Sequence, residues 1–107
     1  MAIALMMEFP GGTQDNYDKI LQNLGMARGS ENLPHGLIFH VAGPTENGWH
    51  VVDVWESHAD FDRFFAERLG AAIRLSGVVP TTPREFPVYN LAGIRLPAHV
   101  SMIGMVA

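Results

Sequence analysis

The chain has 107 residues, enough for one small domain and too few for two. Apolar residues make up 48% of it and charged residues 17%, a balance that points to an oligomer or an apolar cavity in so small a protein. The net charge of −4, with 7 scattered Lys and Arg residues, argues against nucleic acid as a partner. The lack of cysteine excludes disulfides and thiolate catalysis.

An apolar run at residues 2–9, closed by a turn signal at residues 10–12, predicts a buried strand. The run has no basic start and is too short for a signal peptide or a membrane span, so we expect a cytoplasmic protein without a membrane partner. A helix should follow, with Thr13 as its N-cap and its end near Gly25 or Gly29. Its apolar stripe consists of Tyr17, Ile20, Leu21 and Leu24.

Two β-patterned runs, residues 37–43 and 49–57, flank the hairpin signal Asn47-Gly48. A second helix then begins after Ser57, because Ser57 and Asp60 approximate a capping box, and it ends before residue 77. Its apolar stripe consists of Phe61, Phe64, Phe65 and Leu69. A last strand at residues 86–92 contains a proline, which indicates an edge position.

The element order is therefore β-α-β-β-α-β, an α+β ferredoxin-like arrangement in which an antiparallel sheet carries both helices on one face. We assign this domain to residues 1–92. Residues 93–107 form an apolar extension, expected to pack on or swap with a partner subunit. Two sheets facing one another through their uncovered faces would close a dimeric barrel, so a homodimer is expected.

The hairpin sorts its residues onto two faces, here with Gly43 paired to Gly48. The face expected against the helices carries Leu37, Phe39, Val41, Val52 and Val54. The face expected to line the lumen carries Ile38, His40, Ala42, Trp49, Val51, Asp53 and Trp55. This assignment rests on solvation, because two tryptophans are badly placed in water and an unpaired aspartate is badly placed in hydrocarbon.

On the second face, His40 and Asp53 would be diagonal neighbours, about 7 Å apart between their Cα atoms. Asp53 could orient the imidazole of His40, and an imidazole in a pocket can move a proton in either direction near neutral pH. The pair is therefore a candidate general base. An equally weighted alternative is that the two side chains only satisfy one another structurally.

Substrate contacts are expected from two tryptophans, which can stack on a flat molecule, and from three further side chains. These candidates are Trp55, Trp49, Ile38, Val51 and Tyr89. No two histidines stand at a metal-ligand spacing, so a metal site is not expected. We expect no other cofactor either. Phosphate-loop, nucleophile-elbow and serine-triad spacings do not occur.

The segment 34–65, PHGLIFHVAGPTENGWHVVDVWESHADFDRFF, resembles the dimeric α/β-barrel superfamily, in particular the antibiotic biosynthesis monooxygenase-like proteins. The specific part is G-x-x-x-H-x-A-G followed by G-W-x-V-x-D-V-W-E-S-x-x-x-F-x-x-F. The resemblance implies a homodimer with a ligand cavity between sheet and helices or in the lumen. It also implies a pocket role for the tryptophan before Glu-Ser, here Trp55. The asparagine–tryptophan–histidine set of the haem-degrading branch has no match, because the second helix has no histidine after His58.

Relatives of this kind include cofactor-independent monooxygenases, haem-degrading enzymes, cyclases and isomerases. We expect a small-molecule enzyme of secondary metabolism, a cofactor-independent monooxygenase that acts on an apolar aromatic or polyketide-like substrate. His40, held by Asp53, would be its base. Two alternatives stay open: an oxygen-independent cyclase or isomerase in the same pocket, and a non-enzymatic protein that binds a small ligand.

Overall fold

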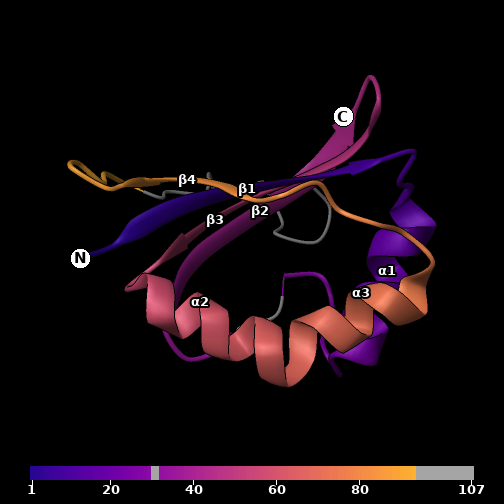
Figure 1. Ribbon diagram of the computed structural model, residues 1–107, viewed down its shortest axis with the longest axis horizontal. Helices are drawn as coiled ribbons and strands as arrows, with labels where there is room; N and C mark the ends of the chain where they lie inside the picture. Colours follow the sequence, from indigo (N-terminus) through magenta and orange to yellow (C-terminus); the bar gives the residue numbers. More distant parts are fainter. Residues whose placement is uncertain (30–31, 94–107) are drawn as a thin grey trace.

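The computed structural model describes residues 1–29 and 32–93. Their elements are β1 (Ile3–Pro10), α1 (Gln14–Asn23), β2 (Leu37–Thr45), β3 (Gly48–Trp55), α2 (His58–Phe64), the π-helical segment η1 (Phe65–Leu69), α3 (Gly70–Ser76) and β4 (Arg84–Pro87). The strands form one antiparallel sheet in the order β2-β3-β1-β4, and all helices lie on one of its faces (Figure 1). The predicted ferredoxin-like fold is confirmed. The predicted extension 93–107 lies outside the described residues, except for Gly93.

Helix α1 begins and ends where its sequence signals predict. The Thr13 hydroxyl accepts a hydrogen bond from the backbone N–H of Asn16, and the Asn16 side chain accepts one from the backbone N–H of Thr13, which completes a capping box. At the other end Gly25 adopts a left-handed φ of 71°, a conformation that favours glycine. The Asn16 amide also donates to the Ser76 carbonyl at 3.1 Å and so fixes the start of α1 against α3.

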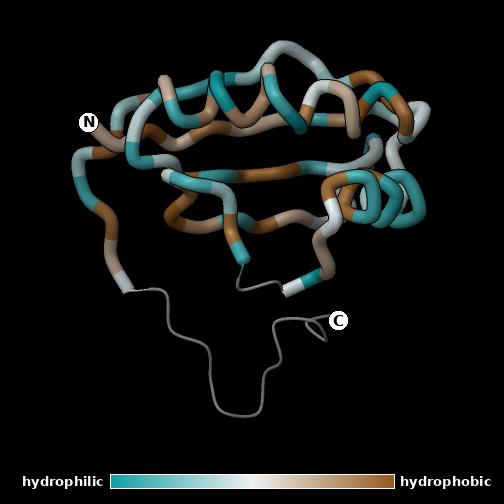
Figure 2. Tube along the Cα trace, turned by 90° about the horizontal axis from the view of Figure 1, so that it is seen from below, coloured by the Kyte–Doolittle hydropathy of each residue, from teal (hydrophilic) through white to brown (hydrophobic). Residues whose placement is uncertain are grey.

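The predicted second helix is continuous from α2 through α3, but its middle, η1, has the wider π-helical turn. The Ser57 hydroxyl caps its start by accepting from the backbone N–H of Asp60, and Gly77 ends it with a φ of 83°. From η1 the Arg68 guanidinium donates to the Leu24 carbonyl at the C-terminal end of α1, where a cation is favourable for the helix dipole. Hydrophilic and hydrophobic residues alternate along this segment (Figure 2), as expected for a helix with one buried side.

The helices cover the face of the sheet that was expected to line a lumen, so the predicted assignment of the two faces is wrong. Trp55 is fully buried against α2, and its ring centroid lies 5.7 Å from that of Phe61 and 5.6 Å from that of Phe64. The sheet's contribution to this core consists of Leu5, Met7, Phe9, Val51 and Trp55. The prediction failed because it treated Asp53 as unsuited to the helix side, whereas the aspartate finds hydrogen-bond donors there.

The hairpin register also differs from the expected one. Thr45, not Gly43, pairs with Gly48, so His40 lies directly opposite Asp53 instead of diagonally. The ladder shifts by one residue between Leu37 and Phe39, which brings Leu37 opposite Trp55 and onto the core. The strict alternation assumed for β2 therefore breaks at this bulge.

No helix of the described residues lies on the opposite face of the sheet (Figure 1). Alternation along the strands places on it Ala4, Met6, Phe39, Val41, Val52, Val54 and Phe86. Val41 is 50% exposed and Phe86 is 52% exposed. We call this set the open face. Strand β4 is shorter than predicted and ends at Pro87, and within the described ranges no helix is long and apolar enough to cross a bilayer.

Candidate functional site

His40 and Asp53 are brought together as cross-strand neighbours on the helix side of the sheet. Nδ1 of His40 lies 2.6 Å from Oδ1 of Asp53. The aspartate residue is 5% exposed, while 30% of the histidine side chain is exposed, since β2 is an edge strand. A carboxylate can only accept, so Nδ1 carries the proton and Nε2 is left as the basic nitrogen of the neutral imidazole.

The second carboxylate oxygen of Asp53 also has a partner. The indole N–H of Trp55 donates a hydrogen bond to Oδ2 of Asp53 over 3.2 Å. The direction of this bond is certain, because an indole N–H can donate but cannot accept. Each carboxylate oxygen of Asp53 therefore accepts one hydrogen bond, Oδ1 from His40 and Oδ2 from Trp55. Its burial costs less free energy than that of an unpaired carboxylate, and its orientation toward His40 is fixed.

Tyr17 completes this row of side chains from α1. Its hydroxyl lies 2.5 Å from Nε2 of His40, and the two rings are nearly parallel, with an interplanar angle of 6°. Burial, followed by the negative charge of Asp53, raises the pKa of Tyr17 to about 12. The phenol therefore keeps its proton at neutral pH and donates it to Nε2. Tyr17, His40, Asp53 and Trp55 form one continuous hydrogen-bonded row, which we call the relay.

Beside the relay lies a shallow hollow between α1 and the ends of β1 and β3, partly open to solvent, with a cavity volume of about 10 Å³, roughly enough for one water molecule. Its walls include Phe9, Tyr17, Ile20, Trp49 and Val78. Ordinary ligand pockets have volumes of roughly 300 to 1,000 Å³. In the part of the chain that the structure describes, this hollow is therefore a shallow depression with apolar walls and not a preformed ligand pocket.

Trp49 is half of an aromatic pair at this hollow. Its ring stacks on Tyr17 with centroids 5.5 Å apart, so one of its faces is already occupied. Its indole N–H is buried and finds no hydrogen-bond partner among the described residues. A buried donor without an acceptor costs about 1–3 kcal/mol, so the indole N–H of Trp49 lowers the stability of the packing at this end of the sheet.

The remaining predicted contacts do not gather around His40. Val51 is buried in the core beneath the helices. Ile38 is the displaced residue at the bulge and is 37% exposed. Tyr89 is fully exposed beyond the end of β4, at the opposite edge of the sheet from β2.

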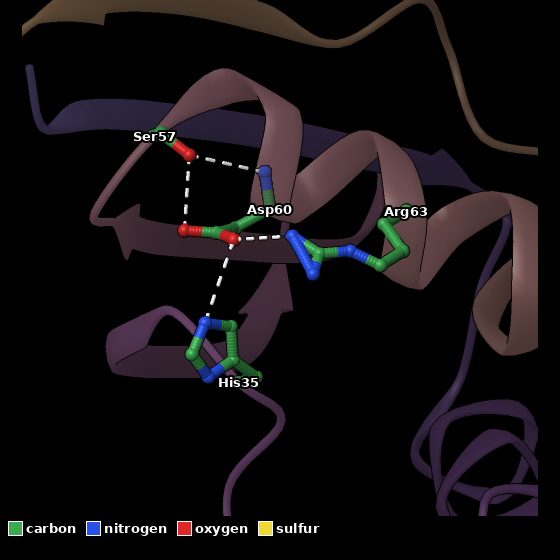
Figure 3. A network of polar contacts seen from close by, with 4 residues as sticks. All are labelled: His35, Ser57, Asp60 and Arg63. Carbon is green, nitrogen blue, oxygen red and sulfur yellow. Dashed lines mark hydrogen bonds and ion pairs between the residues drawn. The ribbon is translucent and has the colours of Figure 1, made fainter.

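A second polar group lies at the start of α2 (Figure 3). His35, Glu56 and Asp60 each offer a ligand atom within 4.8 Å of the others, a grouping that the sequence spacing did not reveal. The Asp60 carboxylate is already occupied, because Ser57 donates to Oδ2 at 2.9 Å and Arg63 donates to Oδ1 at 2.6 Å. A cation would have to displace Arg63, so the arrangement is that of a capped helix start.

The functional residue that the sequence analysis missed is Tyr17. It was placed in the apolar stripe of the first helix, and it does pack against the core. The available signal was its hydroxyl, because a buried tyrosine needs a polar partner for that group. The polar pair on β2 and β3 supplies this partner.

Comparisons with known proteins agree with this geometry at the level of the fold. One similar structure is that of a variant of SnoaB, a cofactor-independent oxygenase from Streptomyces nogalater, with a TM-score of 0.54 and 14% identity over 84% of this chain and 95% of that one. Another is a candidate antibiotic biosynthesis monooxygenase from Deinococcus radiodurans, with a TM-score of 0.54 and 13% identity over 89% and 99% of the two chains.

The chain thus has the fold of antibiotic biosynthesis monooxygenase-like proteins, as its hairpin sequence indicated. No protein-family model matches the sequence, and no curated protein matches it either. At these identities the likeness describes the fold alone. The chemistry has to be argued from the relay.

Proposed function

We propose that the protein is a cofactor-independent monooxygenase of secondary metabolism that acts on a small apolar aromatic or polyketide-like molecule. The observation that carries the proposal is the contact of 2.6 Å between Nδ1 of His40 and the buried carboxylate of Asp53. The contact fixes the imidazole tautomer whose Nε2 can take a proton. His40 is the base, and Asp53 is the residue that positions it.

The surroundings of the base favour an apolar substrate with an acidic O–H or C–H group. Aromatic and aliphatic side chains, among them Tyr17 and Trp49, wall the hollow. Trp55 does not contact the substrate in this proposal; its indole N–H orients the carboxylate of Asp53. Ile38, Val51 and Tyr89 have no part in this proposal.

The reaction balances without a cofactor when the substrate itself is the reductant. An anthrone loses a proton to the base and becomes an electron-rich anion, which reacts with molecular oxygen. One oxygen atom becomes the new carbonyl at the former CH₂ group, and the other leaves as water with the two hydrogens. The protein supplies the base and a water-poor place for the anion.

Two variants test the base with oxygen uptake in the presence of anthrone. His40→Gln removes the imidazole, and Asp53→Asn reverses the tautomer, since an amide N–H would donate to Nδ1 and leave the ring proton on Nε2. Each should lower kcat about 10²- to 10⁴-fold, the usual contribution of general acid–base catalysis. The control is His50→Gln, because His50 lies on the open face beside Glu8, at 3.5 Å. Wild-type oxygen uptake by both variants would show that the pair is not the base.

The same base would also serve a cyclase or isomerase, which needs no oxygen. Exchange of the anthrone CH₂ protons in D₂O under strict exclusion of oxygen measures proton abstraction alone. Exchange without oxidation in air would favour that acid–base enzyme over a monooxygenase. Binding of anthrone with neither exchange nor oxidation would favour a ligand-binding protein.

A further inference from the structure

Both nitrogens of the His40 ring are engaged in the folded protein. Asp53 lies against Nδ1 and the Tyr17 hydroxyl lies 2.5 Å from Nε2. A base in this state has no free position for a proton from another molecule. A proton can reach Nε2 only if Tyr17 swings away or if the proton passes through its hydroxyl.

The packing of Tyr17 opposes the first route. Its ring stacks on Trp49, and its hydroxyl is bound to Nε2 of His40. Tyr17 is also the fourth residue of a helix that is capped at Thr13 and fixed to α3 by Asn16. Moving the ring would break the stacking contact and a short hydrogen bond. The hydroxyl oxygen, by contrast, keeps a lone pair with which it can accept a proton while its own proton moves to Nε2.

We propose that Tyr17 is a catalytic residue of this site, the group through which the substrate proton reaches His40. This inference rests on the proposed function of the His40–Asp53 pair. In one concerted step the substrate O–H or C–H proton passes to the Tyr17 oxygen, and the Tyr17 hydroxyl proton passes to Nε2 of His40. The substrate becomes an anion, Tyr17 stays neutral, and Asp53 stabilises the imidazolium.

The raised pKa of Tyr17 is consistent with a concerted relay, because a tyrosinate next to Asp53 is strongly disfavoured and never has to form. The Tyr17 ring and Trp49 form an aromatic wall beside the relay, which favours an apolar ligand over a charged one.

The first test needs no substrate. Diethyl pyrocarbonate acylates unprotonated imidazole nitrogens, and mass spectrometry resolves the five histidines of the chain. In the wild-type protein His40 should react at least about tenfold more slowly than the exposed His35, because Nε2 is covered. In Tyr17→Phe, which keeps the ring, its rate should rise toward that of His35, with the other histidines unchanged. Equal reactivity of His40 and His35 in the wild type would overturn the proposal.

The second test is oxygen uptake with anthrone by Tyr17→Phe, whose folding is checked by thermal unfolding. A relay predicts a loss of about 10²-fold or more in kcat, even though His40 is now uncovered. Wild-type or faster turnover by Tyr17→Phe would overturn the relay and show that Tyr17 is only a cover. Loss of turnover in His40→Gln together with full turnover in Tyr17→Phe would support His40 as the base and refute the catalytic role of Tyr17. Full turnover in His40→Gln would instead overturn the proposed function.

Discussion

At the scale of single residues, Asp53 is the side chain that allows the polar groups of the relay to lie beside an apolar core. It accepts from His40 and from Trp55, so neither donor is left without a partner next to the aromatic side chains of α2. Buried polar groups are tolerated when every member has its partner, and they are costly when one is removed. The site and the core therefore depend on the same carboxylate.

This dependence predicts a difference between two substitutions of Asp53. Asp53→Leu leaves the donors of His40 and Trp55 without an acceptor, at a cost of about 1–3 kcal/mol for each in the free energy of unfolding. Asp53→Asn keeps both contacts, because its carbonyl accepts from Trp55 and its amide donates to a His40 ring of the other tautomer. Urea unfolding should place the midpoint of Asp53→Asn near that of the wild type and that of Asp53→Leu well below it. Equal midpoints would mean that the carboxylate contributes nothing through these bonds.

The residue pair was predictable, and its surroundings were not. Period-two alternation places His40 and Asp53 on a common face in the expected register and also in the observed one, because the two registers differ by two residues. Which face meets the helices depends on whether Asp53 can be satisfied there. Asp53 is satisfied there because the indole N–H of Trp55 points back to its own strand and because α1 brings Tyr17 to His40. Both contacts depend on tertiary packing and cannot be predicted from local sequence patterns.

At the scale of elements, β4 is the weakest part of the sheet. It is short, all four of its residues are exposed, and it pairs only with β1. One side-chain contact ties it to the helical layer, where Nδ1 of His58 at the start of α2 lies 2.7 Å from Glu85. The sequence predicted the strand too far along the chain, because β4 spans Arg84–Pro87 and after it only one further hydrogen bond to the β1 side is found in the described residues, from the Val88 N–H to the Ala2 carbonyl.

The contact between His58 and Glu85 makes the attachment of β4 depend on pH. The hydrogen bond to Glu85 is the largest cause that raises the pKa of His58, and the nearby Asp62 charge adds to it. A raised pKa means that the folded state holds the proton more tightly. The contribution is complete below about pH 6.5, the pKa of a free histidine, and it is lost as the pH rises through the raised value.

Amide exchange measured by NMR checks this dependence. Protection factors of the β4 amides, corrected for intrinsic exchange, should fall between pH 6 and pH 8.5 in the wild type. His58→Gln should show low protection at both values, while His35→Gln, whose histidine contacts Asp60 at 3.8 Å, should behave as the wild type. A pH-dependent β4 in His58→Gln would assign the effect to another group.

At the scale of the whole molecule, the helices cover one face of the sheet and leave the open face apolar (Figure 1). The fold class could be predicted because short sequence patterns are enough to indicate the order of the elements and the positions of the turns. We propose that a second copy covers the open face and forms the expected homodimer.

A charge on this face should separate the copies. Sedimentation at micromolar concentration should give the mass of a dimer, and Val41→Glu should raise the dissociation constant about tenfold or more, since a buried unpaired carboxylate costs at least 1.4 kcal/mol. Leu75→Glu is the matched control, because Leu75 is 74% exposed on α3, on the helix side. A monomeric mass for the wild type would contradict the dimer.

The bulge in β2 has a consequence for how this chain tolerates changes of length. Because Leu37 pairs with Trp55 and Phe39 with Val54, Ile38 has no place of its own in the ladder. Deleting Ile38 would restore a regular ladder and leave His40 opposite Asp53. Deleting a residue between Val41 and Thr45 would instead put His40 out of phase and turn it to the other face. Insertions and deletions among related sequences should therefore be found before His40 and not between His40 and the hairpin turn.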